Sequence, residues 1–259
     1  MRSGNQLLTQ NSSYQGFSPD PSAQTIQWQW PDYNPVMSCT DAKIRCNGGT
    51  SANSVAPAVP GDEISATWQQ WTHSQGPVIV WMYKCAGDFS SCDGSGAGWF
   101  KIDESGFSGD GTSVFLDTET PSGWGIADLV GGGSFKSTIP DLTPGNYLVR
   151  HELIALHQAN APQFYAECAQ IELGGSGSGA PAASDMVAIP GYCSDSDPNI
   201  SVRLFRSQEQ MLSTNRELTP PIRSLSTTTA SPRRTPFPAP PCSVAPLPRR
   251  RELSGRRCN

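Results

Sequence analysis

The stretch that decides the fold is HELIALHQANAPQFYAEC, residues 151–168. The chain enters it from a Pro-Gly turn signal at residues 144–145, and the run that follows is β-compatible but too short and irregular to indicate a helix. Residues 158–162 are polar and contain a proline, which suits a hairpin loop. A second strand is expected to begin near Gln163. The stretch therefore predicts a β-hairpin.

This hairpin gathers three polar side chains on one face. Side chains alternate on a strand, so a loop that closes symmetrically places His157 opposite Gln163, with Tyr165 two residues further along the same face. Directly opposed residues have Cβ atoms roughly 4.5–5.5 Å apart. The other face points towards a core and carries Phe164, Ala166 and Cys168. Spacing alone favours an ordinary hairpin with a solvated polar face over a functional site.

The rest of the chain has the composition of an all-β protein. It has 259 residues, with 25 Gly and 23 Pro, and only 16% of the residues are charged. Short apolar runs separated by clusters of Gly, Pro, Ser, Asp and Asn are typical of a β-sandwich rather than a helical or α/β fold. Further strands are expected at residues 63–68, 78–83, 100–102, 112–116 and 134–139.

Charge divides the chain into segments. Residues 206–259 carry ten Arg and three Glu, a net charge of about +7, so the remainder carries about −12 because the whole chain carries −5. This tail is rich in Ser, Thr, Pro and Arg and cannot bury enough apolar surface to fold, so we expect it to be disordered. Residues 1–13 form an atypical polar segment. Residues 14–205 are expected to form one domain, with the Gly-rich residues 174–183 as a loop rather than an interdomain linker.

The cysteines indicate an oxidising compartment. Six of the eight lie before residue 206, and an even number in a Gly-rich β domain indicates disulfides. Cys85 and Cys92 flank a short loop and are expected to pair, whereas the spacing leaves the other pairings open. The chain has no apolar run of about 18 residues that would span a membrane. Met1 leads into no apolar stretch of the signal-peptide type, which conflicts with the cysteine pattern.

Several motifs in order resemble one family. They are Cys-Asn-Gly-Gly at 46–49, Pro-Gly-Asp at 60–62, His-Ser-Gln-Gly-Pro at 73–77, the strand 147–157 and Gln-Phe-Tyr at 163–165. Over residues 14–205 the chain resembles the fungal lytic polysaccharide monooxygenases of auxiliary-activity family nine, formerly glycoside hydrolase family sixty-one. The resemblance implies an immunoglobulin/fibronectin-like antiparallel β-sandwich with long loops.

The resemblance also implies a function. Members of this family are secreted copper oxidoreductases that use an external electron donor and O2 or H2O2. They cleave cellulose or a related β-1,4-glucan at C1 and/or C4. By this resemblance the protein is an extracellular, monomeric cellulose-degrading enzyme that holds one copper ion and acts on a glucan surface. The acidic body agrees in arguing against a nucleic-acid partner, and no membrane partner is expected.

The resemblance assigns roles to particular residues. It makes His73 and Tyr165 copper ligands, with the tyrosine in a weak axial position, and imidazole nitrogen is a donor that suits copper. It makes His157, Gln163 and Tyr165 the catalytic group that hydrogen-bonds the oxygen species and steers protons. It also pairs Cys46 with Cys168 beside the site. A further bridge is expected between Cys39 and Cys193.

One residue of the family pattern is absent. The family holds copper with a brace whose first member is an N-terminal histidine, and residues 1–13 contain no histidine, as in a chain truncated at the N-terminus. The three histidines are His73, His157 and His151, and we expect a structural or surface role for His151. It is six residues from His157, so the helical HExxH zinc motif is absent. We therefore expect the chain from Met1 to bind copper weakly.

Two alternatives follow from that absence. The first is a non-catalytic secreted β-sandwich that binds polysaccharide, with Trp28, Trp30 and Trp71 stacking on sugars wherever they are exposed. Burial of these tryptophans in a core is the competing interpretation. The second alternative is an inactive, truncated gene product.

Overall fold

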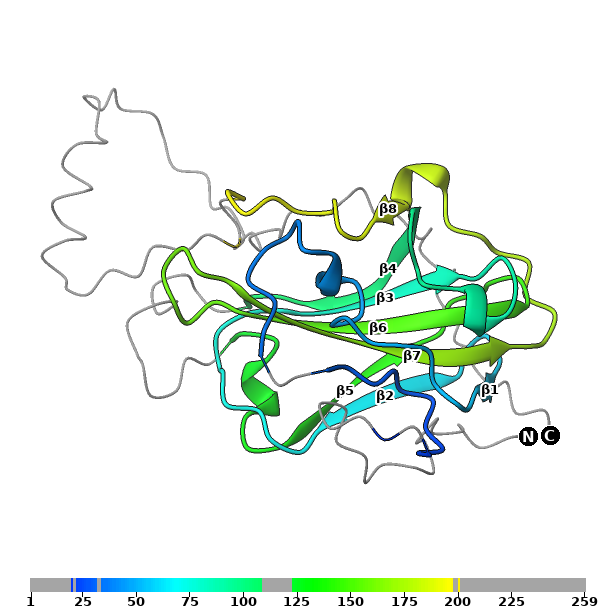
Figure 1. Ribbon diagram of the computed structural model, residues 1–259, viewed down its shortest axis with the longest axis horizontal. Helices are drawn as coiled ribbons and strands as arrows, with labels where there is room; N and C mark the ends of the chain where they lie inside the picture. The colour runs from blue at the N-terminus through cyan, green and yellow to red at the C-terminus, as the bar shows by residue number, and fades with distance from the viewer. Residues whose placement is uncertain (1–19, 21, 32–33, 109–122, 198–199, 201–259) are drawn as a thin grey trace, which may run out of the picture.

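The structure is a computed structural model that describes residues 20, 22–31, 34–108, 123–197 and 200 (Figure 1). The described strands are β1 (Ala56–Ala58), β2 (Glu63–Trp68), β3 (Val78–Lys84), β4 (Ala97–Ser105), β5 (Gly133–Thr138), β6 (Gly145–Ala155), β7 (Gln163–Leu173) and β8 (Val187–Ala188). The described helices are short 3-10 turns: η1 (Ala42–Ile44), η2 (Phe89–Ser91), η3 (Ala127–Leu129) and η4 (Ala183–Asp185). No helix in this part of the chain is long and apolar enough to cross a membrane.

The strands form two sheets (Figure 1). The larger sheet has the order β1-β7-β6-β3-β4-β8, and the smaller one pairs β2 with β5. All pairings are antiparallel except that of β1, which runs parallel to β7 at the sheet edge. The expected antiparallel β-sandwich is therefore confirmed, with this one parallel pair added at the edge.

The centre of the large sheet is buried on both faces. Residues 78–82 of β3 are a continuous apolar run and are buried without interruption, as expected in a covered sheet. Residues 147–155 of β6 are also buried throughout, although they include Arg150, His151 and Glu152. Strand β7 instead alternates buried and partly exposed residues, since it lies nearer the edge. The two faces of the large sheet therefore belong to two separate layers of the molecule.

The inner layer lies between the two sheets. Its core combines Val80, Met82, Tyr147 and Val149 of the large sheet with Ile64 of β2, and Phe135 of β5 packs against it. A neighbouring cluster, next to the end of β6, contains Trp71, Val78, Ile126, Leu129, Leu153 and Ala155. This second cluster lies beneath the residues that the sequence analysis assigned to the site.

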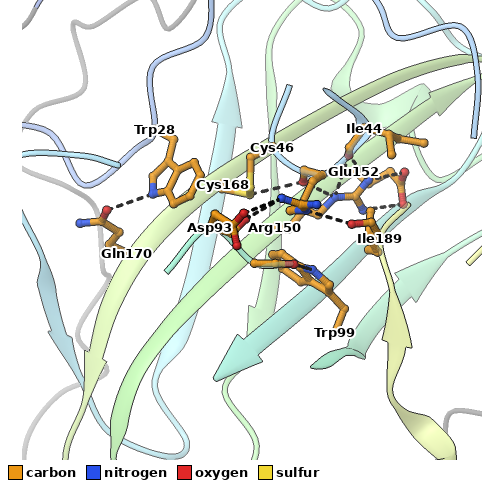
Figure 2. The surroundings of a disulfide bond; sticks show 12 residues. Trp28, Ile44, Cys46, Asp93, Trp99, Arg150, Glu152, Cys168, Gln170 and Ile189 are labelled. Carbon is orange, nitrogen blue, oxygen red and sulfur yellow. Dashed lines mark hydrogen bonds and ion pairs between the residues drawn. A yellow bond between two sulfur atoms is a disulfide. The ribbon is translucent and has the colours of Figure 1, made fainter. Parts of the chain in front are cut away.

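The outer layer consists of loops held by disulfides and by a buried ion pair. Cys46–Cys168, Cys85–Cys92 and Cys39–Cys193 are all bonded, so the three expected pairings are confirmed. Figure 2 shows the Arg150 guanidinium beside the first of these bonds, where it donates to Glu152 and to the carbonyl oxygen of Ile44 at 2.8 Å. The loop of residues 34–46 is thereby fixed over the face of the large sheet.

The expected strands compare closely with the observed ones. The prediction of 63–68 matches β2 residue for residue, 78–83 is one residue short of β3, and 134–139 is displaced by one from β5. Residues 100–102 are the middle of the longer β4. The strand expected at 112–116, the segment 1–13 and the tail 206–259 lie outside the described residues. The loop at 174–183 begins beside β1, where Gly174 N donates to Ala58 O at 2.8 Å, and then meets the turn before β6, where Gly179 O accepts from Thr143 N at 2.9 Å.

Candidate active site

The hairpin that carries the site has a longer loop than expected. Strand β6 ends at Ala155, which faces Gln163, and Leu153 faces Tyr165. The prediction that His157 lies directly opposite Gln163 is therefore wrong. The reason is tertiary: Leu156 N donates to Gln75 O at 2.8 Å, so the chain leaves the β6–β7 ladder two residues before His157.

The loop between β2 and β3 is joined to the end of β6. Besides the Leu156 contact, Ile154 N donates to Pro77 O at 3.2 Å. Gly76 has φ +137°, and a Cβ there would lie 1.7 Å from Ile154 O, so only glycine allows this approach. Because residues 73–77 lie against this strand end, His73 comes within reach of His157 and Tyr165.

His73 and Tyr165 are in direct contact. Nε2 of His73 lies 3.1 Å from the Tyr165 hydroxyl oxygen, and that hydroxyl donates to Gln163 Oε1 at 2.9 Å. Because the phenol hydrogen is used for Gln163, the contact with the imidazole requires a hydrogen on Nε2 of His73. The structure thus brings three of the expected site residues into one hydrogen-bonded chain.

His157 reaches the same place from the loop rather than from a strand. Its ring stacks on that of His73 with centroids 4.2 Å apart and planes at 6°. Its Nδ1 is buried and has no hydrogen-bond partner among the described residues. All four expected site residues, His73, His157, Gln163 and Tyr165, are therefore neighbours, although the register that brings them together differs from the expected one.

Both site imidazoles are held in the neutral form. Burial, and secondarily the charge of His157, lower the pKa of His73. Burial also lowers the pKa of His157. Near neutral pH each ring therefore has one nitrogen lone pair, as a metal ligand or a proton acceptor requires.

Two expectations about neighbouring residues are resolved by burial. Trp28, Trp30 and Trp71 are 4%, 7% and 6% exposed, so none of them can stack on a sugar ring. His151 is also buried and lies in the inner layer, with its ring in an edge contact with Trp68 at 6.2 Å. Burial lowers the pKa of His151 to about 4. Of its two expected roles, burial excludes the surface one.

Sequence reasoning missed the part that Trp71 plays in the site. Its indole makes edge contacts with the rings of both His73 and Tyr165, at centroid distances of 5.1 and 5.0 Å. The available signal is that Trp71 stands two residues before His73 in the sequence. From sequence, Trp71 is expected either to stack on sugars or to lie in the core. Within the described residues no three His, Cys, Asp or Glu side chains gather as a metal cluster.

Comparisons with known proteins agree on one family. The family model of Auxiliary Activity family 9 (formerly GH61) matches residues 4–213. The AA9 family lytic polysaccharide monooxygenase D of Thermothelomyces thermophilus is 72% identical over 193 residues, which are 74% of this chain and 75% of that protein. The AA9 family lytic polysaccharide monooxygenase B of Heterobasidion irregulare is 40% identical over 206 residues, 76% of this chain and 82% of that protein.

The fold is also similar to that of a solved structure. The crystal structure of a cellulose-active polysaccharide monooxygenase from M. thermophila superposes with a TM-score of 0.70 and 72% identity. The match covers 74% of this chain and 84% of that one.

Proposed function

The chain belongs to Auxiliary Activity family 9, and from that premise we propose that it cleaves cellulose or a related β-1,4-glucan oxidatively with one copper ion. The proposal includes attack at C1 and/or C4 of the sugar ring. Three disulfides support action outside the cell, in an oxidising compartment. The partner is a polysaccharide surface, on which the chain acts as a monomer.

The observation that carries the proposal is the convergence of two donor atoms. Nε2 of His73 and the hydroxyl oxygen of Tyr165 lie 3.1 Å apart, and burial lowers the pKa of His73, which favours its neutral form. An imidazole nitrogen with a weaker oxygen donor beside it fits copper. Copper bound there would supply the one-electron chemistry that activates O2 or H2O2. To accept the ion, His73 must move its hydrogen from Nε2 to Nδ1.

Gln163 and His157 would act on the donors and on protons. Gln163 accepts the hydrogen of the Tyr165 hydroxyl, which holds the phenol oxygen in place and leaves its lone pairs directed away from Gln163. His157 is neutral and has a buried Nδ1 without a partner among the described residues, so it can hold or pass on a proton beside His73. The external electron donor and the oxidant come from solution.

The described residues supply an incomplete copper site. Lone pairs point outward in the plane of an imidazole, and the rings of His73 and His157 are stacked nearly parallel, so they cannot direct nitrogens at one ion without turning. The remaining histidine, His151, is buried in the inner layer. We therefore propose that His73 and Tyr165 bind copper only weakly without a further nitrogen ligand. A histidine-led segment before Tyr14 would restore tight binding.

The test is release of oxidised oligosaccharides from cellulose with ascorbate as reductant, followed by mass spectrometry. Two proteins are compared: residues 1–259, and the same chain with residues 1–13 replaced by a segment that starts with histidine. We expect little product from the first and clear product from the second, which His73→Ala should abolish. If neither protein releases oxidised sugars, the enzymatic proposal fails. Tight copper binding by the first protein would contradict the proposed incompleteness.

The stacked imidazoles also support a second candidate function. With one nitrogen donor available, the chain could bind polysaccharide without redox chemistry. Sedimentation with cellulose in the presence of EDTA distinguishes the two functions. Binding that persists without copper, together with no oxidised product from either protein, would favour the binding function.

A further inference from the structure

Trp71 lies against both proposed metal donors at once. Its ring is nearly perpendicular to that of His73, with planes at 85°, and to that of Tyr165, with planes at 89°. Both centroid distances are about 5 Å, in the range of favourable edge contacts between aromatic rings. A ring that is perpendicular to two neighbours restrains the tilt of each of them.

The indole nitrogen makes this arrangement costly for stability. Nε1 of Trp71 is buried and has no hydrogen-bond partner among the described residues, and an unpaired buried N–H is unfavourable. Three other buried tryptophans do donate: Trp28 to Gln170, Trp81 to Glu152 and Trp99 to Gly94 O. Packing alone could be met at position 71 by an apolar side chain without that cost. A role in stability therefore does not explain why an indole is present.

The backbone and the side chain of Trp71 are both held in place by contacts with the rest of the fold. The backbone oxygen of Trp71 accepts from Gly131 N at 2.9 Å, which ties the loop to the turn before β5. The side chain packs in the inner layer with Ile126, Leu129 and Leu153. His73, by contrast, is only partly buried, and its side chain contacts Trp71, His157 and Tyr165.

We propose that Trp71 is a positioning residue that holds the rings of His73 and Tyr165 at the angle where Nε2 and the phenol oxygen converge. The proposal rests on the proposed function of these two side chains as metal donors. It assigns the role to the shape and edge contacts of the aromatic ring rather than to its N–H group. An aromatic replacement should therefore preserve the function, and an aliphatic one of similar bulk should lose it.

The experiment compares Trp71→Leu, Trp71→Phe and Trp68→Leu. Trp68 is the matched control, because it packs against the same cluster and its ring contacts His151 rather than a proposed metal donor. The first measurement uses the metal-free proteins and records the NMR signals of the His73 and Tyr165 rings. The second measures the dissociation constant of Cu(II) added alone, in the protein with the histidine-led segment.

We expect Trp71→Leu to shift and broaden the His73 and Tyr165 ring signals and to raise the copper dissociation constant about 10-fold or more. Trp71→Phe and Trp68→Leu should leave both readouts within about 3-fold of the parent. Unchanged ring signals in Trp71→Leu, or equal losses in Trp71→Leu and Trp68→Leu, would overturn the proposal. Failure of the proposed function would be recognised separately, by loss of copper binding in all proteins while the metal-free ring signals still respond.

If Trp71→Leu does not fold, Trp71→Phe and Trp71→Met are compared instead. The phenylalanine variant must then keep the metal-free ring signals of the parent while the methionine variant changes them. Matching signals in these two variants would contradict a role for the aromatic ring.

Discussion

Arg150 and Glu152 point from β6 into the outer layer, whereas His151 between them points into the inner layer. On the outer side both charges of this pair are satisfied: the Arg150 guanidinium donates to Glu152 at 2.7 and 2.8 Å and to backbone oxygens of Ile44 and Arg45, each at 2.8 Å (Figure 2). Glu152 also accepts from Trp81 and from Tyr192. On the inner side, Nε2 of His151 is buried with no partner among the described residues.

The difference between the two faces follows from what each layer does. A buried charge is tolerable only where hydrogen bonds replace water, and the outer network meets that condition. The inner face instead carries polar groups that stay neutral and unpaired, His151 and Trp71 among them, and leads to the neutral imidazoles of the site. The outer face therefore fixes the fold, while the inner face keeps lone pairs available for chemistry.

The largest effect should come from breaking the outer ion pair. Arg150→Met leaves the Glu152 carboxylate buried without its cation, and we expect the free energy of unfolding to fall by about 3–5 kcal/mol. Urea unfolding measures this change. The metal-free ring signals of His73 and Tyr165 should remain in place, since these rings lie in the other layer.

A double variant sharpens this prediction. Replacing Glu152 by Met as well removes the uncompensated charge, so the double variant should be more stable than Arg150→Met alone. If the loss in free energy of unfolding in the double variant equals the sum of the losses in the two single variants, Arg150 and Glu152 do not act as a unit. The contrast between the two faces would then be lost.

The second effect concerns the inner face and depends on pH. Burial lowers the pKa of His151 to about 4 from an ordinary value of 6.5, so its folded form is neutral while the unfolded chain takes up a proton. Its contribution to stability is complete above about pH 6.5 and is lost as the pH falls to about 4. At 1.36 kcal/mol per pKa unit, the loss is about 3 kcal/mol.

His151→Leu removes that group, so the free energy of unfolding of the variant should depend less on pH between about 6.5 and 4. Burial raises the pKa of Glu167, opposite His151 on β7, to about 7, and its contribution has the reverse sign: present below about pH 4.5 and lost as the pH rises to about 7. Because Glu167 faces His151, both proteins should carry Glu167→Gln, which removes this second titration from the comparison. As the pH falls from 7 to 4, the free energy of unfolding of the parent should drop by about 3 kcal/mol relative to that of the variant. Parallel pH dependences in the two proteins would show that His151 is not held neutral.

The smallest effect should come from the hydrogen-bonded chain of the site. Gln163→Ala removes the acceptor of the Tyr165 hydroxyl and should change stability by only about 1 kcal/mol. It also frees the phenol hydrogen for His73, so the His73 tautomer should move from Nε2–H towards Nδ1–H. Nitrogen-15 NMR of the metal-free protein reads the tautomer directly. An unchanged tautomer would mean that the chain of hydrogen bonds does not control the imidazole.

Most of the fold could be predicted where local signals agree with the tertiary structure. The turn residues Gly61 and Asp62 and the apolar pattern after them predicted β2 to the residue. The register of the hairpin could not be predicted, because it depends on the contact of Leu156 with Gln75, about 80 residues earlier. Very short strands such as β1, with three residues, owe their extended form to a neighbouring strand rather than to their own sequence.

The members of the site were predictable from motifs, but their arrangement was not. His73, His157, Gln163 and Tyr165 are brought together as expected, yet the stacking of the two imidazoles follows from a loop conformation that no spacing rule describes. The role of Trp71 depends on the simultaneous approach of a loop and a strand. The Arg150–Glu152 pair has a sequence signal, since charges that alternate within an apolar run indicate a buried network.

The most direct test of the central claim, that His73 and Tyr165 form one side of a copper site, is the electron-spin spectrum of the chain loaded with one equivalent of Cu(II) and labelled with nitrogen-15 in histidine. If His73 binds the ion, hyperfine coupling to an imidazole nitrogen disappears in His73→Ala and persists in His151→Leu. A spectrum that is the same in the parent and in His73→Ala would contradict the account, because copper would then be bound elsewhere.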